Sequence, residues 1–247
     1  MFKKTLIQIP SPNLSGGISS YYQAIRPHLG DSFRFMIRGR RFRLRYFDKF
    51  VLVSCYIFDF SNYIFRLPFI DKLLINHSLS REAIYRDAGF ILIAKLLGKK
   101  TIVFFRGIDP IMQDKIEKGN YPLFQKVILK ADKIIVLSST FKDKLISWGY
   151  TRKIYIETTV VDDFLIKYDQ NVKAKVCSNL LFLSRVEKYK GIFELISAFE
   201  CLQKERSDIQ LTIAGEGEAL ASIKKMITEK PIKNIQLPGH VIGKEKA

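Results

Sequence analysis

The stretch FLSRVEKYKGIFELI (Phe182–Ile196) decides the fold class of this chain. It opens with apolar residues typical of a buried strand, passes through a charged loop and continues after Gly191 with apolar residues at helical spacing. A strand that leads into a helix is the repeating unit of a parallel α/β sheet, in which ligands bind at the carboxyl ends of the strands. Arg185 and Lys190 lie in that loop and predict a bound anion. A solvated loop is the alternative, because the loop also contains Glu187.

Strands and helices alternate along nearly the whole chain. Strands are predicted at Thr5–Ile9, Phe33–Ile37, Leu73–Asn76, Thr101–Phe105, Lys133–Leu137, Lys153–Glu157, Leu180–Leu183, Ile209–Ile213 and near Ile235–Leu237. Helices are predicted near Ile18–Ile25, Phe47–Arg66, Arg81–Leu97, Ile111–Lys130, Thr140–Trp148, Gly191–Lys204 and Glu218–Glu229. This alternation of strands and helices indicates an α/β fold with mostly parallel, doubly wound sheets.

The alternation pauses after Asp162, in a polar stretch without a clear period. We therefore predict a first domain at residues 1–168, a linker at residues 169–178 and a second domain at residues 179–247. Three strands and two helices leave the second domain incomplete, because a parallel sheet that ends early keeps an unpaired edge.

Composition and charge narrow the class of protein. A chain of 247 residues with 47% hydrophobic content has enough apolar surface for a packed core, which argues against disorder. Its 41 lysines and arginines against 24 acidic residues give a formal charge of +17, which favours phosphates, acidic lipid or nucleic acid as partners. The cysteines Cys55, Cys177 and Cys201 form no C-x-x-C pair, so a reducing cytoplasm fits better than a disulfide framework or a zinc site.

No segment of the sequence is typical of a signal peptide or of a membrane-spanning helix. The apolar run near the N-terminus is short and is cut by Pro10 and Pro12. The most hydrophobic window, Phe50–Ile70, is interrupted by Asp59 and Arg66, and a spanning helix needs about 20 apolar residues.

Glycines follow three of the predicted strands. Gly16 and Gly17 stand between the first strand and its helix, where their backbone N–H groups can face a ligand. Gly215-Glu216-Gly217 and the pair Gly239-His240 occupy the same place after two later strands. The first pair equally fits a plain tight turn, and none of these sites is a complete dinucleotide-binding fingerprint.

Polar residues also follow two strands of the first half. Arg106 and Asp109 come after one strand and His77 ends another, so all three can face a cleft at the carboxyl ends of the strands. They are candidates for the side of such a cleft that binds a polar acceptor. For His77 a structural role as the cap of the next helix is the alternative.

The segment Phe33–Phe50 carries seven basic residues, one acid and several aromatic residues. Such a segment suits an anionic membrane surface, because cations bind acidic lipid and aromatic rings favour the interface. A basic surface strand and loop is the main alternative. A single-stranded nucleic acid is the least favoured partner, because no nucleic-acid-binding motif accompanies the patch.

Together these residues resemble the family 4 (group 1) glycosyltransferases of the GT-B fold, of the type that assembles bacterial surface polysaccharides. The likeness lies in SGGIS, FRGID, ADKIIVLSS, ETTVVDD, LLFLSRVEKYKGIFELISAF, LTIAGEGE and LPGHV, in this order. It implies two Rossmann-like domains on either side of a cleft, and a sugar moved from a nucleotide sugar to a saccharide or lipid-linked saccharide acceptor. Retention of the anomeric configuration and no need for a metal or other cofactor are implied too.

The resemblance also implies roles for individual residues. Arg185 and Lys190 would hold the donor diphosphate and stabilise its charge as the sugar leaves, with Gly16 and Gly17 closing over it. The residues of GHV, Gly239 to Val241, would lie near the base. A protein of this kind is expected in the cytoplasm, peripheral to the inner face of the membrane.

The chain departs from the family pattern in two places. Many relatives carry histidine where this chain has Arg106, which weakens a catalytic role for that position. A pair of donor-binding glutamates that follows GHV in relatives is absent here. The chain therefore resembles a glycosyltransferase truncated at its C-terminus, completed by a separate polypeptide or reduced to a non-catalytic remnant that binds an acceptor or a membrane.

Overall fold

The computed structural model describes residues 4–12, 16–39, 48–160, 178–230 and 232–241. Contacts divide the chain into two compact units, Met1–Asp162 and Asp163–Ala247, and each is described by itself. Of the predicted linker at residues 169–178, only Ser178 is among the described residues. The predicted domain limits therefore stay predictions.

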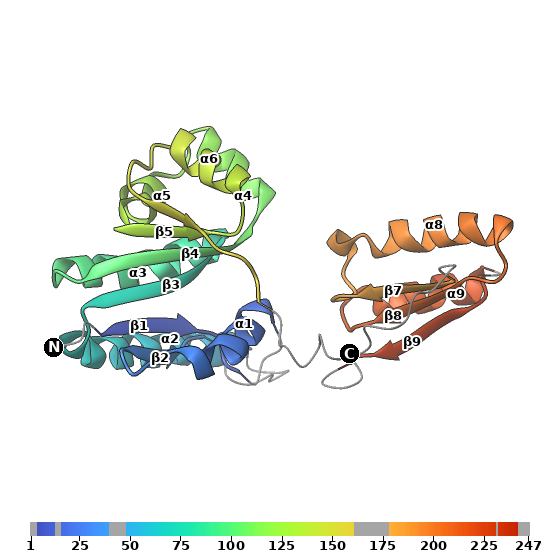
Figure 1. The fold of residues 1–247 in the computed structure, drawn as a ribbon, viewed down its shortest axis with the longest axis horizontal. Coiled ribbons are helices and arrows are strands. Elements are labelled where there is room, and N and C mark those ends of the chain that lie inside the picture. Colours follow the sequence, from blue (N-terminus) through green and yellow to red (C-terminus); the bar gives the residue numbers. More distant parts are fainter. Residues whose placement is uncertain (1–3, 13–15, 40–47, 161–177, 231, 242–247) are drawn as a thin grey trace. The chain divides into compact units, whose positions relative to one another are not determined.

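A six-stranded parallel sheet forms the centre of the first unit (Figure 1). Its strand order is β2-β1-β3-β4-β5-β6. The strands are β1 (Thr5–Ile9), β2 (Phe33–Ile37), β3 (Lys72–Leu79), β4 (Lys100–Ile108), β5 (Lys133–Val136) and β6 (Ile154–Ile156). The order reverses between β1 and β3, and ligands bind at such a switch point of an open α/β sheet.

Helices α1 (Gly17–Ile25), α2 (Asp48–Arg66), α3 (Arg81–Leu96) and α6 (Ser139–Ser147) lie close to their predicted positions. The single helix expected over Ile111–Lys130 is wrong. The chain instead forms α4 (Pro110–Glu117), α5 (Pro122–Lys126) and the 3₁₀ turn η3 (Ile128–Lys130). Gly119 ends the first of these with a φ of 72°, and Pro122 starts the next at a position where its missing N–H is not needed.

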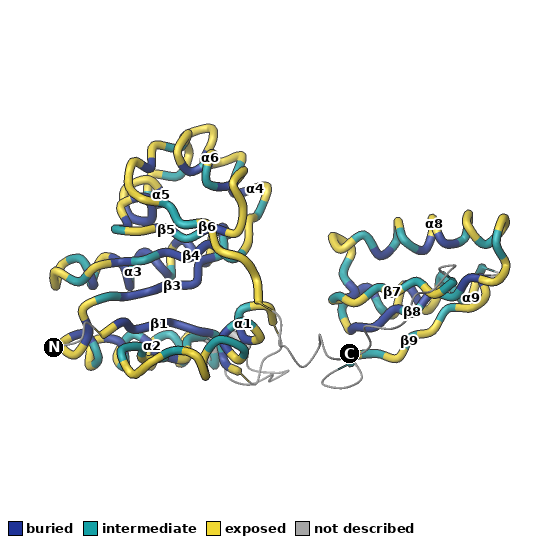
Figure 2. The backbone as a smooth tube through the Cα atoms, in the orientation of Figure 1, coloured by how far each residue is buried: buried dark blue, intermediate teal, exposed yellow. Residues whose placement is uncertain are grey.

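The two faces of this sheet have separate cores. On one face, β1 and β3 contribute Leu6 and Ile75 to a buried cluster that includes side chains of α2 and α3. On the other, Ile7, Leu74 and Phe104 pack with Tyr22 of α1. Figure 2 shows β1 and β3 largely buried, as expected of parallel strands covered on both sides.

The second unit contains a three-stranded parallel sheet in the order β7-β8-β9. Its elements are β7 (Asn179–Leu183), η4 (Lys188–Lys190), α8 (Ile192–Glu205), β8 (Gln210–Ala214), α9 (Leu220–Glu229) and β9 (Ile235–Gly239). Alternate residues, such as Leu211 and Ile213, pack against both helices. The predicted fold class, α/β with Rossmann-like parallel sheets, is confirmed.

Candidate functional site in the second unit

The loop after β7 presents the two predicted cations to solvent. The Arg185 side chain is 65% exposed, and its guanidinium donates to Glu187 Oε1 at 2.9 Å and to the Tyr189 hydroxyl at 2.6 Å. Lys190 Nζ lies 5.4 Å from the centre of the Tyr189 ring. Gly191 then takes a left-handed conformation, with a φ of 76°, and α8 begins. Arg185 and Lys190 thus flank one tyrosine at the start of a helix.

The loop after β8 is joined to this first loop through backbone atoms. Val186 N donates to Glu216 O at 3.0 Å and Ala219 N donates to Val186 O at 3.1 Å. A Cβ on Gly215 would lie 1.9 Å from Ser184 O, and one on Gly217 would lie 2.2 Å from Val186 O. Glycine is therefore required here by the approach of another loop, while Glu216 remains exposed.

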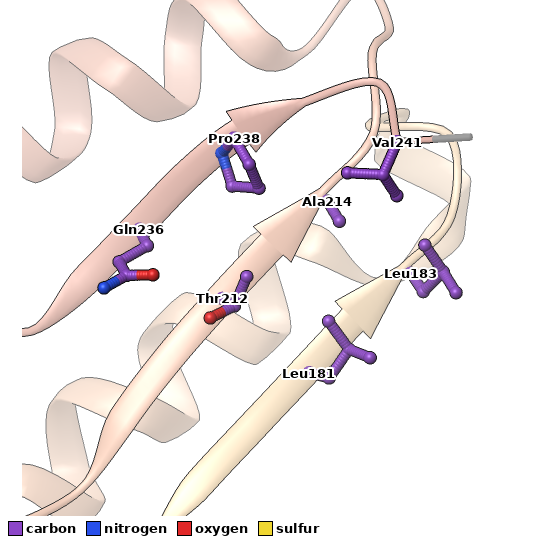
Figure 3. Close-up of a pocket in the computed structure, with 7 residues that line it drawn as sticks. All are labelled: Leu181, Leu183, Thr212, Ala214, Gln236, Pro238 and Val241. Atoms are coloured by element: carbon purple, nitrogen blue, oxygen red, sulfur yellow. The ribbon is translucent and has the colours of Figure 1, made fainter. Parts of the chain in front are cut away.

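The end of β9 completes this edge of the sheet. Gly215 N donates to Gly239 O at 2.7 Å, so the loops after all three strands meet there. His240 is exposed. Val241 lines a shallow hollow of about 380 Å³ with side chains of all three strands (Figure 3). This hollow lies on the face opposite the helices, where Leu181 and Leu183 are exposed.

Candidate residues in the first unit

Gly16 and Gly17 differ from the glycines of the second unit, because packing does not require them. A Cβ on either would meet no atom of the described residues within 4 Å, and Gly16 has an extended backbone with a φ of 172°. Gly17 opens α1, and no side chain among the described residues caps that helix end. The first turn of α1 is therefore open to a ligand that approaches its backbone.

Arg106 is positioned by a bulge in β4. In the register with β3, His77 pairs with Phe105 and Ser78 pairs with Gly107, so Arg106 is the extra residue. Its guanidinium carbon lies 3.6 Å from the ring centre of Phe104 and 3.8 Å from that of Tyr21, on α1. This stacking holds the guanidinium beside the helix that follows Gly16 and Gly17.

Polar contacts fix one side of the Arg106 guanidinium. Its Nε donates to Asn76 Oδ1 at 3.0 Å, and the same oxygen accepts from the Tyr22 hydroxyl at 3.2 Å. Its Nη2 is buried and has no hydrogen-bond partner within the described ranges of the chain. The Nη2 group of a fixed guanidinium, with its two N–H donors, thus lacks a partner among the described residues at the switch-point end of the sheet.

Asp109 caps a helix, and His77 does not, contrary to the alternative interpretation of His77 as a helix cap. Asp109 accepts from Ile111 N at 2.9 Å and caps α4. His77 caps no helix, because Ser80 Oγ accepts from Ala83 N and caps α3. His77 is instead fully buried on the face of the sheet opposite Arg106.

A buried ionic network, which the sequence did not reveal, surrounds His77. Asp87 is wholly buried on α3, and its Oδ2 lies 2.7 Å from His77 Nδ1. Its Oδ1 accepts from Arg38 Nη1 at 2.6 Å, and the same nitrogen donates to Gln8 Oε1 at 2.9 Å. Arg38 Nη2 donates to Asn76 O at 3.1 Å. The network joins the carboxyl ends of β1, β2 and β3.

This network corrects part of the predicted basic surface. Arg38 belongs to the segment Phe33–Phe50, yet its side chain is only 8% exposed and is paired with Asp87. It therefore cannot bind a membrane or a nucleic acid. Residues 40–47, which supply four more of the counted cations, lie outside the described residues.

The charges of the network keep Asp87 ionised. Burial alone raises the pKa of its carboxyl group. The Arg38 guanidinium, the hydrogen bond from His77 and the nearby Arg86 together outweigh burial and hold this pKa well below its usual range. Burial lowers the pKa of Arg38, and Asp87 opposes that shift. Each residue of the ion pair thus helps to keep the other one charged.

No cluster of histidine, cysteine and acidic residues suited to a metal ion occurs in the part of the chain that the structure describes. No described helix is both long and apolar enough to cross a bilayer.

Comparison with known proteins

Residues 169–246 match the family model described as glycosyl transferases group 1. The match spans the loops that carry Arg185, Lys190, Gly215 and Gly239. The matched segment makes up about a third of the chain and is similar to a glycosyltransferase domain. The predicted enzyme class is thereby confirmed at the level of this domain. A comparison with curated proteins returned no match.

Solved structures show the same fold in proteins of low sequence identity. HepE from Anabaena, determined with UDP and glucose, has a TM-score of 0.59 at 13% identity over 97% of this chain and 70% of HepE. The UDP-GlcNAc 2-epimerase of Neisseria meningitidis has a TM-score of 0.57 at 12% identity over 98% of this chain and 73% of the epimerase. TarM has a TM-score of 0.50 at 18% identity over 71% of this chain and 34% of TarM. At these identities the likeness establishes the fold alone.

Proposed function

We propose that this chain takes part in glycosyl transfer from a nucleoside-diphosphate sugar, of the UDP class, to a saccharide acceptor. The match of residues 169–246 to a group 1 glycosyltransferase domain carries the proposal, because that segment contains the exposed cations of the loop after β7. The fold alone does not decide the reaction, since a UDP-GlcNAc 2-epimerase shares it.

In this proposal the loop after β7 stabilises the leaving group. As the bond between the sugar and the diphosphate breaks, negative charge grows on the phosphate oxygens. Arg185 offers a planar fork of donors and Lys190 a compact charge, and both interactions strengthen as that charge develops. Gly16 and Gly17 are proposed to approach the diphosphate through backbone N–H groups. Glu216 and the residues from Gly239 to Val241 are proposed to contact the rest of the donor.

In this proposal the acceptor binds to the first unit. Arg106 is the best supported residue there, because its guanidinium is fixed by stacking and its Nη2 has no hydrogen-bond partner among the described residues. His77 and Asp109 act through other residues, the first in the buried network and the second as a helix cap. We further propose a lipid-linked acceptor, retention of configuration, surface polysaccharide as the product and a location at the inner face of the cytoplasmic membrane.

A non-catalytic remnant that binds an acceptor or a membrane is the second candidate. The exposed Leu181 and Leu183 favour it, because a complete sheet of this type buries both faces. A separate polypeptide that covers this face is the alternative to a remnant. Transfer by the purified chain alone would exclude the remnant, and transfer only after a second polypeptide is added would favour completion.

Replacing Lys190 with alanine tests the diphosphate site. We expect UDP affinity to fall by about tenfold to a hundredfold, because a hydrogen bond to a charged group contributes about 1.5 to 3 kcal/mol. Lys188→Ala is the matched control, since Lys188 is an exposed lysine of the same 3₁₀ turn. Isothermal titration calorimetry measures both. Equal losses of UDP affinity in the two variants, with unchanged circular dichroism, would show that Lys190 does not bind the diphosphate.

Glu187 competes with the diphosphate for Arg185. Its carboxylate is bonded to Arg185 Nη1, so a phosphate must displace it. Glu187→Gln is expected to tighten UDP binding by up to about fivefold, because an exposed ion pair contributes about 0 to 1 kcal/mol. Weaker UDP binding in this variant would show that Glu187 positions Arg185 and does not compete with the diphosphate for it.

A further inference from the structure

The outer face of α2 carries no charged side chain among those that the structure describes in this helix. The exposed residues among the described side chains of α2 are Val53, Ser54, Ile57, Phe58, Ser61, Ile64 and Phe65. In α9, by contrast, the exposed residues include Lys224, Lys225 and Glu229. A helix on the surface of a water-soluble domain normally has charged residues on its outer face. The outer face of α2 therefore differs from an ordinary solvated surface.

Most of the exposed side chains of this face are apolar. Val53, Ile57, Ile64 and Phe65 lie at helical spacing, and Phe69 of the following 3₁₀ turn η2 (Leu67–Phe69) extends this set. We call these five residues the α2 stripe. Phe65 is 77% exposed and Phe69 is 71% exposed. Single exposed apolar residues are ordinary, but several on one face of a helix indicate a surface that binds a partner.

A cationic pocket adjoins the stripe at Phe69. This pocket of about 170 Å³ is lined by Lys4, Arg34 and Arg66, by Phe69, and by the buried residues Leu6 and Ile70. Leu6 and Arg34 lie in β1 and β2, and Lys4 immediately precedes β1. The pocket is thus at the amino ends of these strands, away from the candidate acceptor residues.

The cations of this pocket are suited to an anion. Arg66 is held by neutral acceptors, with its Nε donating to Asn62 Oδ1 at 2.8 Å and its Nη1 to Phe35 O at 3.2 Å. The nearby carboxylate of Asp71 accepts from the backbone N–H of Lys4 at 2.8 Å. A positioned guanidinium with two further cations and an apolar floor fits a phosphate attached to an apolar body.

We propose that the α2 stripe and the cationic pocket form one docking surface for an anionic phospholipid membrane. The phosphate of a lipid headgroup occupies the pocket, and the stripe enters the boundary between headgroups and acyl chains. Charge decides between this occupant and a second copy of the chain. Two copies joined through this face would bring their lysines and arginines together, whereas acidic lipid neutralises them. The proposal rests on the membrane location proposed above and names its surface, and it does not depend on transferase activity.

Sedimentation of the full chain with vesicles tests the proposal. We expect binding to vesicles of mixed phosphatidylglycerol and phosphatidylcholine, weaker binding as salt rises, and little binding to phosphatidylcholine alone. The double variant Phe65→Ser with Phe69→Ser is expected to lose at least about tenfold in partitioning. Lys4→Gln with Arg34→Gln is expected to lose about fivefold for each charge.

Matched controls separate the surface from general changes in polarity and charge. Ile64, in the stripe, and Ile146, on α6, are each 51% exposed. Ile64→Glu is expected to lower vesicle binding, and Ile146→Glu is expected to leave it unchanged. Lys224→Gln with Lys225→Gln removes the same charge from the second unit and is also expected to have little effect. Circular dichroism confirms the fold of each variant.

Three results would overturn the proposal. Equal vesicle binding by the Ile64→Glu and Ile146→Glu variants would show that the α2 stripe does not contact the membrane. Normal binding by the stripe variants together with full competition by glycerol 3-phosphate would make the pocket a site for a soluble phosphate. No vesicle binding, with a dimer that Ile64→Glu converts to a monomer, would assign the face to a second copy. UDP binding is measured separately, so failure here leaves the proposed donor site untouched.

Discussion

Gly217→Ala is expected to destabilise the second unit by about 3 kcal/mol or more, because the new Cβ would lie 2.2 Å from Val186 O and 2.7 Å from Val186 C. Both are backbone atoms, so no side-chain rotation relieves the contact. The loops after β7 and β8 must separate, and the hydrogen bonds of Val186 with Glu216 and Ala219 are lost with them. Hydrogen exchange measured by mass spectrometry should show faster exchange over β7 to β9 than in the parent chain.

Two other glycines provide graded controls for this substitution. Gly239 has open space around it but a φ of 83°, so Gly239→Ala is expected to cost about 1 to 2 kcal/mol. Gly16→Ala meets no atom and keeps an extended backbone, so its effect on stability is expected to lie within about 1 kcal/mol of zero. Normal exchange over β7 to β9 in Gly217→Ala would contradict the close approach of the two loops.

Asp87→Asn is expected to destabilise the first unit by about 3 to 5 kcal/mol, because it leaves the buried Arg38 guanidinium without its carboxylate. His77 loses the same partner. Asp114→Asn is the matched control, since Asp114 pairs with Lys118 on the surface and that pair is worth about 0.5 kcal/mol. Urea unfolding, monitored by hydrogen exchange over β1 to β4, measures the stability of both variants. A loss no larger in Asp87→Asn than in the control would contradict the network.

The same network predicts a specific response to acid. The pKa of Asp87 is lower in the folded chain than its value of about 3.9 in an unfolded chain. Its contribution is therefore fully present well above pH 4 and is lost as the pH falls below that value. The urea midpoint of the parent chain should fall more steeply than that of Asp87→Asn as the pH is lowered from 6 to 3. Parallel curves would contradict this assignment.

Local sequence patterns were sufficient for the fold class. The strands of the first unit begin within one residue of their predicted starts, because buried parallel strands read as short apolar runs between loops. The helix expected over Ile111–Lys130 failed for a local reason, since Gly119 and Pro122 together end one helix and begin another. That signal was present in the sequence.

The site residues depended on contacts that no local pattern contains. Arg38 and Asp87 are 49 residues apart, and Arg38 reads in the sequence as one more surface cation. A signal for Asp87 did exist, since it lies between the apolar residues Ile84 and Ala88 of α3 and is as buried as they are. A buried carboxylate of this kind indicates a buried partner. Which residue fills that role follows only from the order of strands in the sheet.

The glycines illustrate the same limit. Gly215 and Gly217 resemble a ligand-binding turn in the sequence, and the structure shows another backbone lying against them. Gly16 and Gly17 resemble an ordinary turn equally well, and no atom of the described part of the chain lies within 4 Å of a Cβ added to either. Distinguishing the two cases requires the position of the loop after β7, which lies about 30 residues before Gly215 in the sequence.

Equilibrium binding of UDP, UMP and uridine to the purified chain tests the proposed donor site most directly. If Arg185 and Lys190 hold a diphosphate, UDP should bind at least about tenfold more tightly than UMP, because the second phosphate supplies further charge-assisted hydrogen bonds. Uridine should bind most weakly. Equal affinity for UDP and UMP, or no binding of either, would contradict the assignment of this loop to the diphosphate of a sugar nucleotide.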